Sequence, residues 1–216
     1  MPDCLSGEDL SCIRGERLVF TKLAFRLEEG GALVLRGPNG SGKSSLLRLM
    51  AGLGRPTAGA LMWNGASILQ DKAAHRTRAA YVGHADAIKP ALTVAENLKF
   101  WTGMHGIDGD ISAALARLGL ERHAQVSARY LSSGERRRLA LATLAAVPAY
   151  LWLLDEPTVG LDATSQSALE GLLADHRSGG GMVVLSTHVD LRLDDARTLE
   201  LGAYAVGRDT VDEAFA

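Results

Sequence analysis

Three compact apolar runs stand out along the chain, and each of them ends in glycine or in polar residues. They cover residues 32–37 (ALVLRG), 150–157 (YLWLLDEP) and 181–188 (GMVVLSTH). Continuous apolar runs of this length are typical of strands buried on both faces of a parallel sheet. Helical patterns over residues 44–51 and 165–177 alternate with these runs. The alternation predicts right-handed crossovers and a mostly parallel sheet, with ligands at the carboxyl ends of its strands.

The segments outside these runs follow other patterns. The first thirty residues contain RLVF and AFRL, which are typical of short strands in an antiparallel edge. Between about residues 85 and 130, helix signals occur without a strand pattern. Thr93 with Glu96 three positions later is a capping-box signature, and Gly119 is placed to close a second short helix. These signals predict a small helical insertion in the α/β core.

The longest apolar stretch, residues 139–154, is interrupted by Thr143 and Pro148. It is shorter than the ~20 residues that a bilayer-spanning helix requires. Pro148 divides it naturally into the end of a helix and a following strand. We expect no transmembrane helix, so that any work at a membrane is done from its surface.

The composition is typical of a soluble globular chain, because 47% of its 216 residues are hydrophobic and 22% are charged. The net charge of -2 lacks the basic excess of most nucleic-acid-binding domains. Cys4 and Cys12 have no second pair with which to complete a zinc site. Asp3 and Glu8 occupy the region where a secretory signal would be basic and then apolar. We therefore expect reduced thiols in a cytoplasmic protein.

The segment GPNGSGKSS satisfies the pattern G-x-x-x-x-G-K-[ST], follows a predicted strand and opens a predicted helix. Its glycines let the backbone N–H groups face inward around a β-phosphate. Lys43 would reach the β- and γ-phosphates, and the Ser44 hydroxyl would bind Mg²⁺. The predicted nucleotide-binding residues are Gly37, Pro38, Asn39, Gly40, Ser41, Gly42, Lys43, Ser44 and Ser45. The chain is expected to bind a nucleoside triphosphate.

Which class of phosphate-loop protein this is remains open at this point. A guanine-specific GTPase needs a base-reading motif such as N-K-x-D, which the chain lacks. A small-molecule kinase needs an arginine-bearing lid over the phosphates, and Arg76, Arg78 or the arginines at 136–138 could supply one.

Two adjacent carboxylates end the second apolar run. Asp155 fits the acidic residue that lies beside Mg²⁺ at the end of such a strand. Glu156 could orient and deprotonate the attacking water, which is most of what phosphoryl transfer requires from the protein. His188 ends the next apolar run and could contact the γ-phosphate. We predict Glu156 and His188 as catalytic residues, and Ser44 and Asp155 as the Mg²⁺ ligands.

A second segment with the features of an anion site follows about ninety residues after the first. In LSSGERRRLA, a Leu-Ser-Ser-Gly turn opens into a predicted helix, whose free N–H groups and hydroxyls favour an anion. The segments GPNGSGKSS, LSSGE, LLDEP, GLD and STH occur in this order, and together they resemble the ATP-binding-cassette (ABC) ATPases over essentially the whole chain.

The resemblance implies why the chain carries two phosphate-facing segments. The signature motif of this family is matched by Leu131, Ser132, Ser133, Gly134 and Glu135. Two subunits of the family associate head to tail, so Ser132 and Gly134 of one chain would close over the γ-phosphate held by the other. The loop that links the two sites is matched by Gly160, Leu161 and Asp162. Arg136–Arg138 would then be mostly a solvated or ion-paired helix face, and nucleic acid is not an expected partner.

The resemblance also gives the expected domain organisation. One ABC ATPase domain spans 1–216, with its core at 1–84 and 136–216 and a helical insertion at about 85–135.

This sequence departs from the family pattern at several positions. Ser133 replaces one of the two usual glycines of the signature motif, and Glu135 replaces its glutamine. His84 stands where the family has the Q-loop glutamine, and an imidazole is a poor ligand for Mg²⁺. His84 could hold a water or act in the relay to a membrane partner. Arg14 falls where many relatives have the aromatic residue that stacks on adenine, so Arg14 or Arg17 could stack there instead.

Within the superfamily, the segments VGHAD and ENLKFWTGMHG are similar to those of the haem-exporter ATP-binding subunits of bacterial cytochrome c maturation. The resemblance implies two ATPase copies bound to integral membrane subunits at the cytoplasmic face of the inner membrane, with ATP and Mg²⁺ as cofactors. Hydrolysis would drive the handling of haem, although His105 and His123 lack the context of haem ligands. Phe100 and Trp101 cannot face one side, so one of them could contact a membrane subunit.

Three alternatives remain beside this interpretation. The first is the ATPase subunit of another ABC transporter. The second is a soluble phosphate-loop kinase, which would transfer phosphate to an acceptor without dimerising. The third is a non-transport cassette acting on nucleic acid or ribosomes, and such proteins usually carry two cassettes or long insertions.

Overall fold

The computed structural model describes residues 2–205, so Met1 and residues 206–216 of the predicted domain lie outside the described residues. Its central sheet has five strands in the order β6-β7-β8-β3-β9, and every neighbouring pair is parallel. The strands are β3 (Ala32–Arg36), β6 (Ala79–Val82), β7 (Leu151–Asp155), β8 (Met182–Ser186) and β9 (Arg197–Glu200). The three apolar runs thus form the three central strands, and the α/β prediction is confirmed.

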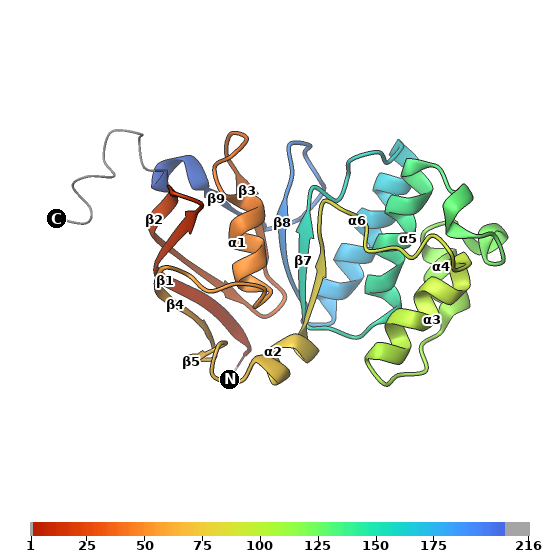
Figure 1. The fold of residues 1–216 in the computed structure, drawn as a ribbon, viewed down its shortest axis with the longest axis horizontal. Coiled ribbons are helices and arrows are strands. Elements are labelled where there is room, and N and C mark those ends of the chain that lie inside the picture. The colour runs from red at the N-terminus through yellow and green to blue at the C-terminus, as the bar shows by residue number, and fades with distance from the viewer. Residues whose placement is uncertain (1, 206–216) are drawn as a thin grey trace.

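Helices cover both faces of this sheet (Figure 1). Helix α1 (Lys43–Met50) packs on the face that includes Leu151 and Leu153. Helices α5 (Ser133–Ala146) and α6 (Ala163–Ser178) pack on the other face, with Trp152 and Leu154. The alternation along β7 follows from the two-residue period of a strand, and it gives the molecule two apolar cores with one sheet between them.

A second, antiparallel sheet lies beyond α1 in the order β2-β1-β4-β5 (Figure 1). Its strands are β1 (Cys4–Arg14), β2 (Arg17–Glu28), β4 (Ala58–Trp63) and β5 (Ala66–Ser67). The predicted antiparallel region is therefore present, but RLVF and AFRL belong to the single strand β2 rather than to two short strands. Lys22, with φ +51, lies at an irregularity of the pairing, so the polar interruption is a bulge and not a turn.

The predicted insertion contains α3 (Val94–Met104), α4 (Ile111–Arg117) and the short 3-10 turns η1 (Glu121–His123) and η2 (Ala128–Tyr130). The capping box of α3 is formed, because Thr93 N donates to Glu96 Oε2 at 2.8 Å and Glu96 N donates to Thr93 Oγ1 at 3.2 Å. Gly119 has φ +63 just after α4. These helices pack against α5 on the side of the molecule away from the antiparallel sheet (Figure 1).

Two short elements complete the described chain, namely α2 (Lys72–Arg78) before β6 and η3 (Leu201–Tyr204) after β9. Helix α5 ends at Ala146 and β7 begins at Leu151, so Pro148 separates helix from strand as predicted. Within residues 2–205, no helix combines the length and the apolar character that crossing a bilayer requires.

Candidate functional site

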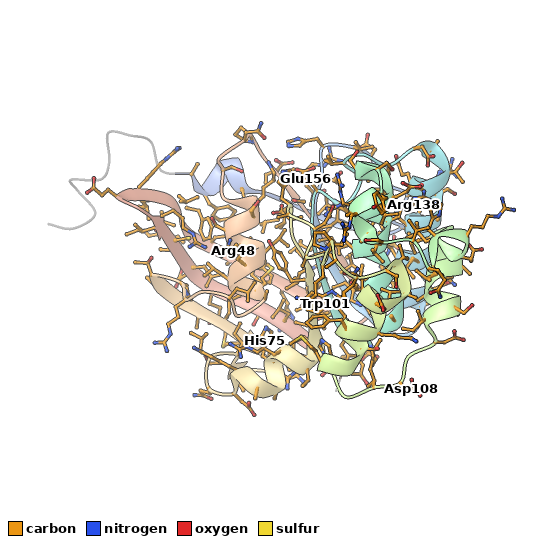
Figure 2. All side chains as sticks on the ribbon, turned by 45° about the vertical axis from the view of Figure 1, so that its right-hand side comes forward. Arg48, His75, Trp101, Asp108, Arg138 and Glu156 are labelled. Atoms are coloured by element: carbon orange, nitrogen blue, oxygen red, sulfur yellow. The ribbon has the colours of Figure 1, made fainter. Side chains whose placement is uncertain are left out.

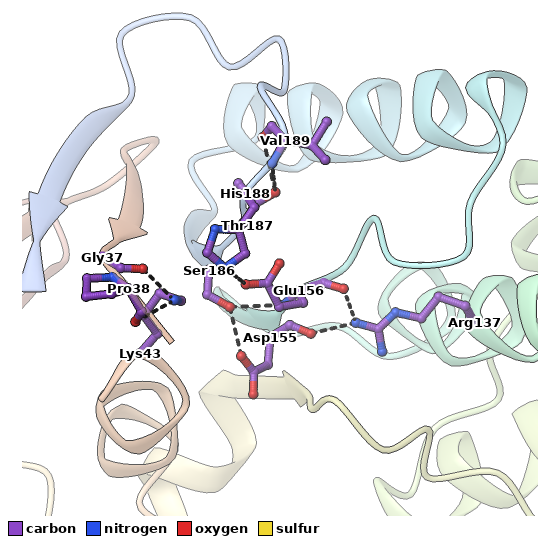
Figure 3. Close-up of polar contacts among 10 residues, drawn as sticks. All are labelled: Gly37, Pro38, Lys43, Arg137, Asp155, Glu156, Ser186, Thr187, His188 and Val189. Carbon is purple, nitrogen blue, oxygen red and sulfur yellow. Dashed lines mark hydrogen bonds and ion pairs between the residues drawn. The ribbon is translucent and has the colours of Figure 1, made fainter. Parts of the chain in front are cut away.

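The loop between β3 and α1 has the backbone of a phosphate nest. Gly37, Gly40 and Gly42 have φ values of +141°, +81° and +101°, in the region that glycine adopts without strain. A Cβ atom at Gly42 would lie 2.6 Å from Val19 Cγ1, so a side chain there would also collide with β2. The Lys43 ammonium donates to Gly37 O at 2.8 Å and to Pro38 O at 3.3 Å (Figure 3). The loop therefore holds a buried cation against its own carbonyl oxygens.

A cavity of about 460 Å³ opens beside this loop, and we call it the nucleotide cavity. It is lined by Arg14, Arg17, Val19, Asn39, Gly40, Gly42, Lys43, Ser44, Ser45, His84, Asp155 and Glu156. Segments far apart in the sequence thus meet at the carboxyl end of the parallel sheet, where the strand pattern predicts a ligand. Ser44 and Asp155 both bring oxygen atoms to this cavity, and oxygen is the ligand atom that Mg²⁺ prefers.

The carboxylates at the end of β7 are held by the end of β8. Ser186, which pairs with Asp155 in the parallel register, donates its hydroxyl to Asp155 Oδ1 at 2.8 Å. The Glu156 N–H reaches both Ser186 O at 3.1 Å and Ser186 Oγ at 3.0 Å (Figure 3). Sequence reasoning missed Ser186, although its place as the last residue of an apolar strand next to Asp155 was a usable signal.

Glu156 adopts an uncommon backbone conformation. Its φ is +48°, which costs a non-glycine residue about 1–2 kcal/mol. One oxygen of its carboxylate lies 3.3 Å from His188 Nε2, so the two predicted catalytic residues are in contact (Figure 3). The chain therefore turns sharply after β7 and brings the Glu156 side chain to the wall of the cavity.

The three consecutive arginines of α5 lie in three different environments. Arg136 donates to Leu131 O at 3.0 Å, and Arg138 donates to Leu118 O at 3.0 Å, at the end of α4. Arg137 is only 4% exposed and forms an ion pair with Asp86 at 3.0 Å. The prediction of a solvated or ion-paired face holds for Arg137 in its ion-paired form, but its guanidinium is buried among backbone carbonyls behind the end of β7 rather than exposed.

The signature segment, residues 131–135, forms the start of α5. Ser132 caps the helix: its N–H donates to Glu135 Oε2 at 2.8 Å, and its hydroxyl also lies 2.8 Å from that oxygen. These donors, more than the nearby His123, hold the pKa of Glu135 below its usual value. Glu135 thus replaces the usual glutamine with a residue that completes a capping box.

The signature segment packs against the linking loop of its own chain. A Cβ atom at Gly134 would lie 2.7 Å from Gly160 O, which explains why only glycine fits there. Asp162 caps α6 by accepting from Ser165 N at 2.8 Å. Hydrogen bonding from the Ser165 side chain, and then from its backbone N–H, lowers the pKa of Asp162. Among the described residues that line the nucleotide cavity, none comes from 131–135.

A second cavity, of about 350 Å³, lies between β6 and α3, and we call it the helical groove. Tyr81, Trp101 and Met104 line it, and Gly83 connects it in sequence to His84. Phe100 turns away and packs under Lys89, whose ammonium is 4.2 Å from the ring centre. In Figure 2, Trp101 lies between the sheet and the helices, lower than Glu156.

Comparison with known proteins gives consistent matches. Residues 20–159 match the family model described as ABC transporter. A curated relative from Paramagnetospirillum magneticum, "Cytochrome c biogenesis ATP-binding export protein CcmA", is 52% identical, and the alignment covers 94% of this chain and 96% of that protein. Its counterpart of the same name from Rhodospirillum rubrum is 53% identical, with 94% and 88% covered. A solved ATP-binding subunit of an ABC transporter superposes with a TM-score of 0.78 at 26% identity, covering 86% of this chain and 79% of that one.

Proposed function

Because this chain belongs to the ABC transporter family and, within it, to the CcmA family of cytochrome c biogenesis ATP-binding export proteins, we propose that it is the ATPase that drives an export step in bacterial cytochrome c biogenesis. The observation that carries the proposal is the nucleotide cavity. It joins the glycine nest, Lys43 and the Asp155–Glu156 pair at one edge of the sheet. This is the set of groups that hydrolysis of a triphosphate requires.

In this proposal the loop residues 37–45 hold the β- and γ-phosphates, with Lys43 as the charged donor. Ser44 and Asp155 would hold Mg²⁺, which neutralises phosphate charge when bound. Glu156 accepts a proton from a water molecule. The oxygen of that water bonds to the γ-phosphorus, and the bond between the γ-phosphorus and the ADP oxygen breaks. His188, in contact with Glu156, orients that carboxylate and the γ-phosphate. The products are ADP and inorganic phosphate.

The active assembly in this proposal contains two copies of the chain, arranged head to tail. The helix start at Ser132 is exposed, yet it lies outside the cavity of its own chain. The backbone N–H groups of Ser133 and Gly134, with the Ser132 hydroxyl released from Glu135, would complete the site on the partner's γ-phosphate. Each dimer would then contain two composite sites.

The helical groove is the proposed contact for an integral membrane subunit. Its apolar lining, which includes Trp101 and Met104, suits a short helix from that subunit, and His84 lies one residue beyond the groove. We place the protein at the cytoplasmic face of the inner membrane, as a peripheral subunit whose hydrolysis drives the handling of haem.

The experiment compares strains in which the gene is deleted and then restored as wild type or as Glu156→Gln. We expect covalent haem on periplasmic cytochromes to be lost in the deletion and to return only with the wild-type gene. Normal cytochromes in the deletion strain would reject the cytochrome c role. Phosphate release by the purified protein tests the reaction itself. An ABC ATPase releases phosphate from ATP without an acceptor molecule, whereas a kinase needs an acceptor molecule to receive the phosphate.

A further inference from the structure

Arg137 is the one member of the arginine triplet whose side chain is buried, and all of its donors have partners. Nη2 donates to Asp155 O at 2.6 Å and to Glu156 O at 2.8 Å, and Nε donates to Pro157 O at 3.3 Å. Nη1 donates to Gly83 O at 2.8 Å and to Asp86 Oδ1 at 3.0 Å. A guanidinium has five N–H groups, and these five contacts match that number.

The arrangement is chemically specific for arginine. A buried cation is tolerated only when its donors are satisfied, and here four of the five acceptors are backbone carbonyls from two separate segments. A lysine has three donors on one nitrogen and cannot span both segments. The planar fork therefore fixes the position of one segment relative to the other.

The two segments are those that flank the proposed catalytic groups. Three consecutive carbonyls, at residues 155–157, surround Glu156 and bond to the same guanidinium (Figure 3). These bonds hold the backbone on both sides of the residue with φ +48°. On the other side, Gly83 and Asp86 flank His84. Arg137 itself lies on α5, five residues after Ser132.

We propose that Arg137 is a positioning residue for ATP hydrolysis, which holds the Glu156 backbone in its left-handed conformation and ties Glu156 and the His84 loop to the signature helix. This inference rests on the proposed function of Glu156 as the base. Arg137 does not itself line the nucleotide cavity and has no hydrogen bond to the loop 37–45, so its loss affects turnover rather than ATP binding.

The test measures ATP turnover, KM and the ATP dissociation constant for Arg137→Gln beside Arg138→Gln as the matched control. Arg138 is on the same helix but bonds to the end of α4. We expect Arg137→Gln to lower kcat about 100-fold, the cost of misplacing a reacting group by about 1 Å, with ATP affinity within about threefold of wild type. Arg138→Gln should keep kcat within about threefold. Unchanged kcat in Arg137→Gln, or an equal loss in binding and turnover, would overturn the inference.

A double variant separates positioning from a merely structural role. If Arg137 acts through Glu156, adding Arg137→Gln to Glu156→Gln lowers kcat no further, because the group being positioned is already gone. An independent further loss would contradict the inference. If Arg137→Gln does not fold, Arg137→Lys takes its place, with about a tenfold fall in kcat expected and wild-type kcat as the contradicting result. Normal turnover in Glu156→Gln alone would instead reject the proposed base.

Discussion

The nucleotide cavity and the signature segment both present phosphate-binding features, but they differ in how far one chain completes them. In the cavity, groups from β2, the 37–45 loop, the His84 loop and the end of β7 converge, and Lys43 and Asp155 are buried. At the signature segment, Ser132 and Ser133 are exposed, and the local polar contacts come from Glu135. The polar groups of the nucleotide cavity are thus partly buried, whereas those of the signature segment are exposed on the surface.

This difference indicates that the two regions have separate roles in ATP hydrolysis. A buried cation at the start of a helix that follows a glycine-rich loop is suited to bind phosphate tightly within one chain. An exposed, well-capped helix start is suited to meet a ligand carried by another molecule. We therefore assign ATP binding to the cavity, and we propose that the signature segment of a second chain completes catalysis. Variants of the two regions should then fail in different ways.

The largest effect is expected at the base. Glu156→Gln removes the proton acceptor but keeps the shape of the side chain, so kcat should fall about 10²- to 10⁴-fold while ATP still binds. Phosphate release and a fluorescence titration with nucleotide measure the two quantities. Wild-type turnover in this variant would show that another group activates the water.

The next effect is expected at the signature segment. Ser132→Arg places a bulky cation at the exposed start of α5, where it would block the approach of a second chain. We expect turnover to fall about 100-fold, comparable to losing an electrostatic donor to the transition state, with ATP affinity unchanged. The same assays check this. A loss of ATP binding would mean that the signature segment serves the site of its own chain.

Lys43→Ala should weaken ATP binding, whereas Ser132→Arg should lower turnover. Loss of a charge-assisted hydrogen bond to phosphate costs about 1.5–3 kcal/mol, so the ATP dissociation constant should rise about 10- to 100-fold. Lys99→Ala, an exposed position on α3, is the control.

At an ATP concentration that saturates wild type but not Lys43→Ala, each of the two variants alone should turn over little ATP, so a mixture of them tests whether the sites are composite. Lys43→Ala retains an intact signature segment and Ser132→Arg retains an intact cavity, so an equimolar mixture should regain part of the lost turnover. No recovery, with both proteins folded, would argue against composite sites.

The smallest effect concerns the stability of α5. Glu135→Ala removes the capping box and should lower the free energy of unfolding by about 0.5–1 kcal/mol at pH 7, as measured by urea denaturation. The folded-state pKa of Glu135 is lowered, so its contribution is present above the unfolded value of about 4.3 and is lost as pH falls through the folded pKa. The difference between wild type and variant should therefore shrink in acid. Glu121→Ala, at an exposed position, should show no such difference.

How much the sequence predicted depended on whether the signal was local. The three central strands and the nest were predictable because an apolar run and a glycine pattern act over a few residues. The capping box at Thr93 was predictable for the same reason. In β2, the bulge at Lys22 was not predictable, because it depends on pairing with β1.

Arg137 and Ser186 show where local reasoning ends. Nothing near Arg137 in the sequence distinguishes it from Arg136 and Arg138, since its acceptors come from residues 83–86 and 155–157. Ser186 likewise matters only because the parallel register sets it beside Asp155. Both residues acquire their contacts from tertiary packing. The roles of His84, Arg14 and Arg17 stay predictions, although all three line the nucleotide cavity.

In the proposed assembly ATP lies between the cavity of one chain and the signature segment of another, and a cross-link between separately labelled chains can detect this arrangement. Both chains carry Glu156→Gln, and both carry Cys4→Ser and Cys12→Ser so that no native cysteine remains. One chain also carries Asn39→Cys, and the other carries Ser133→Cys. We expect a disulfide between the two chains that forms with ATP and not without it. A monomer that binds ATP and never forms this disulfide would show that ATP does not lie between two chains.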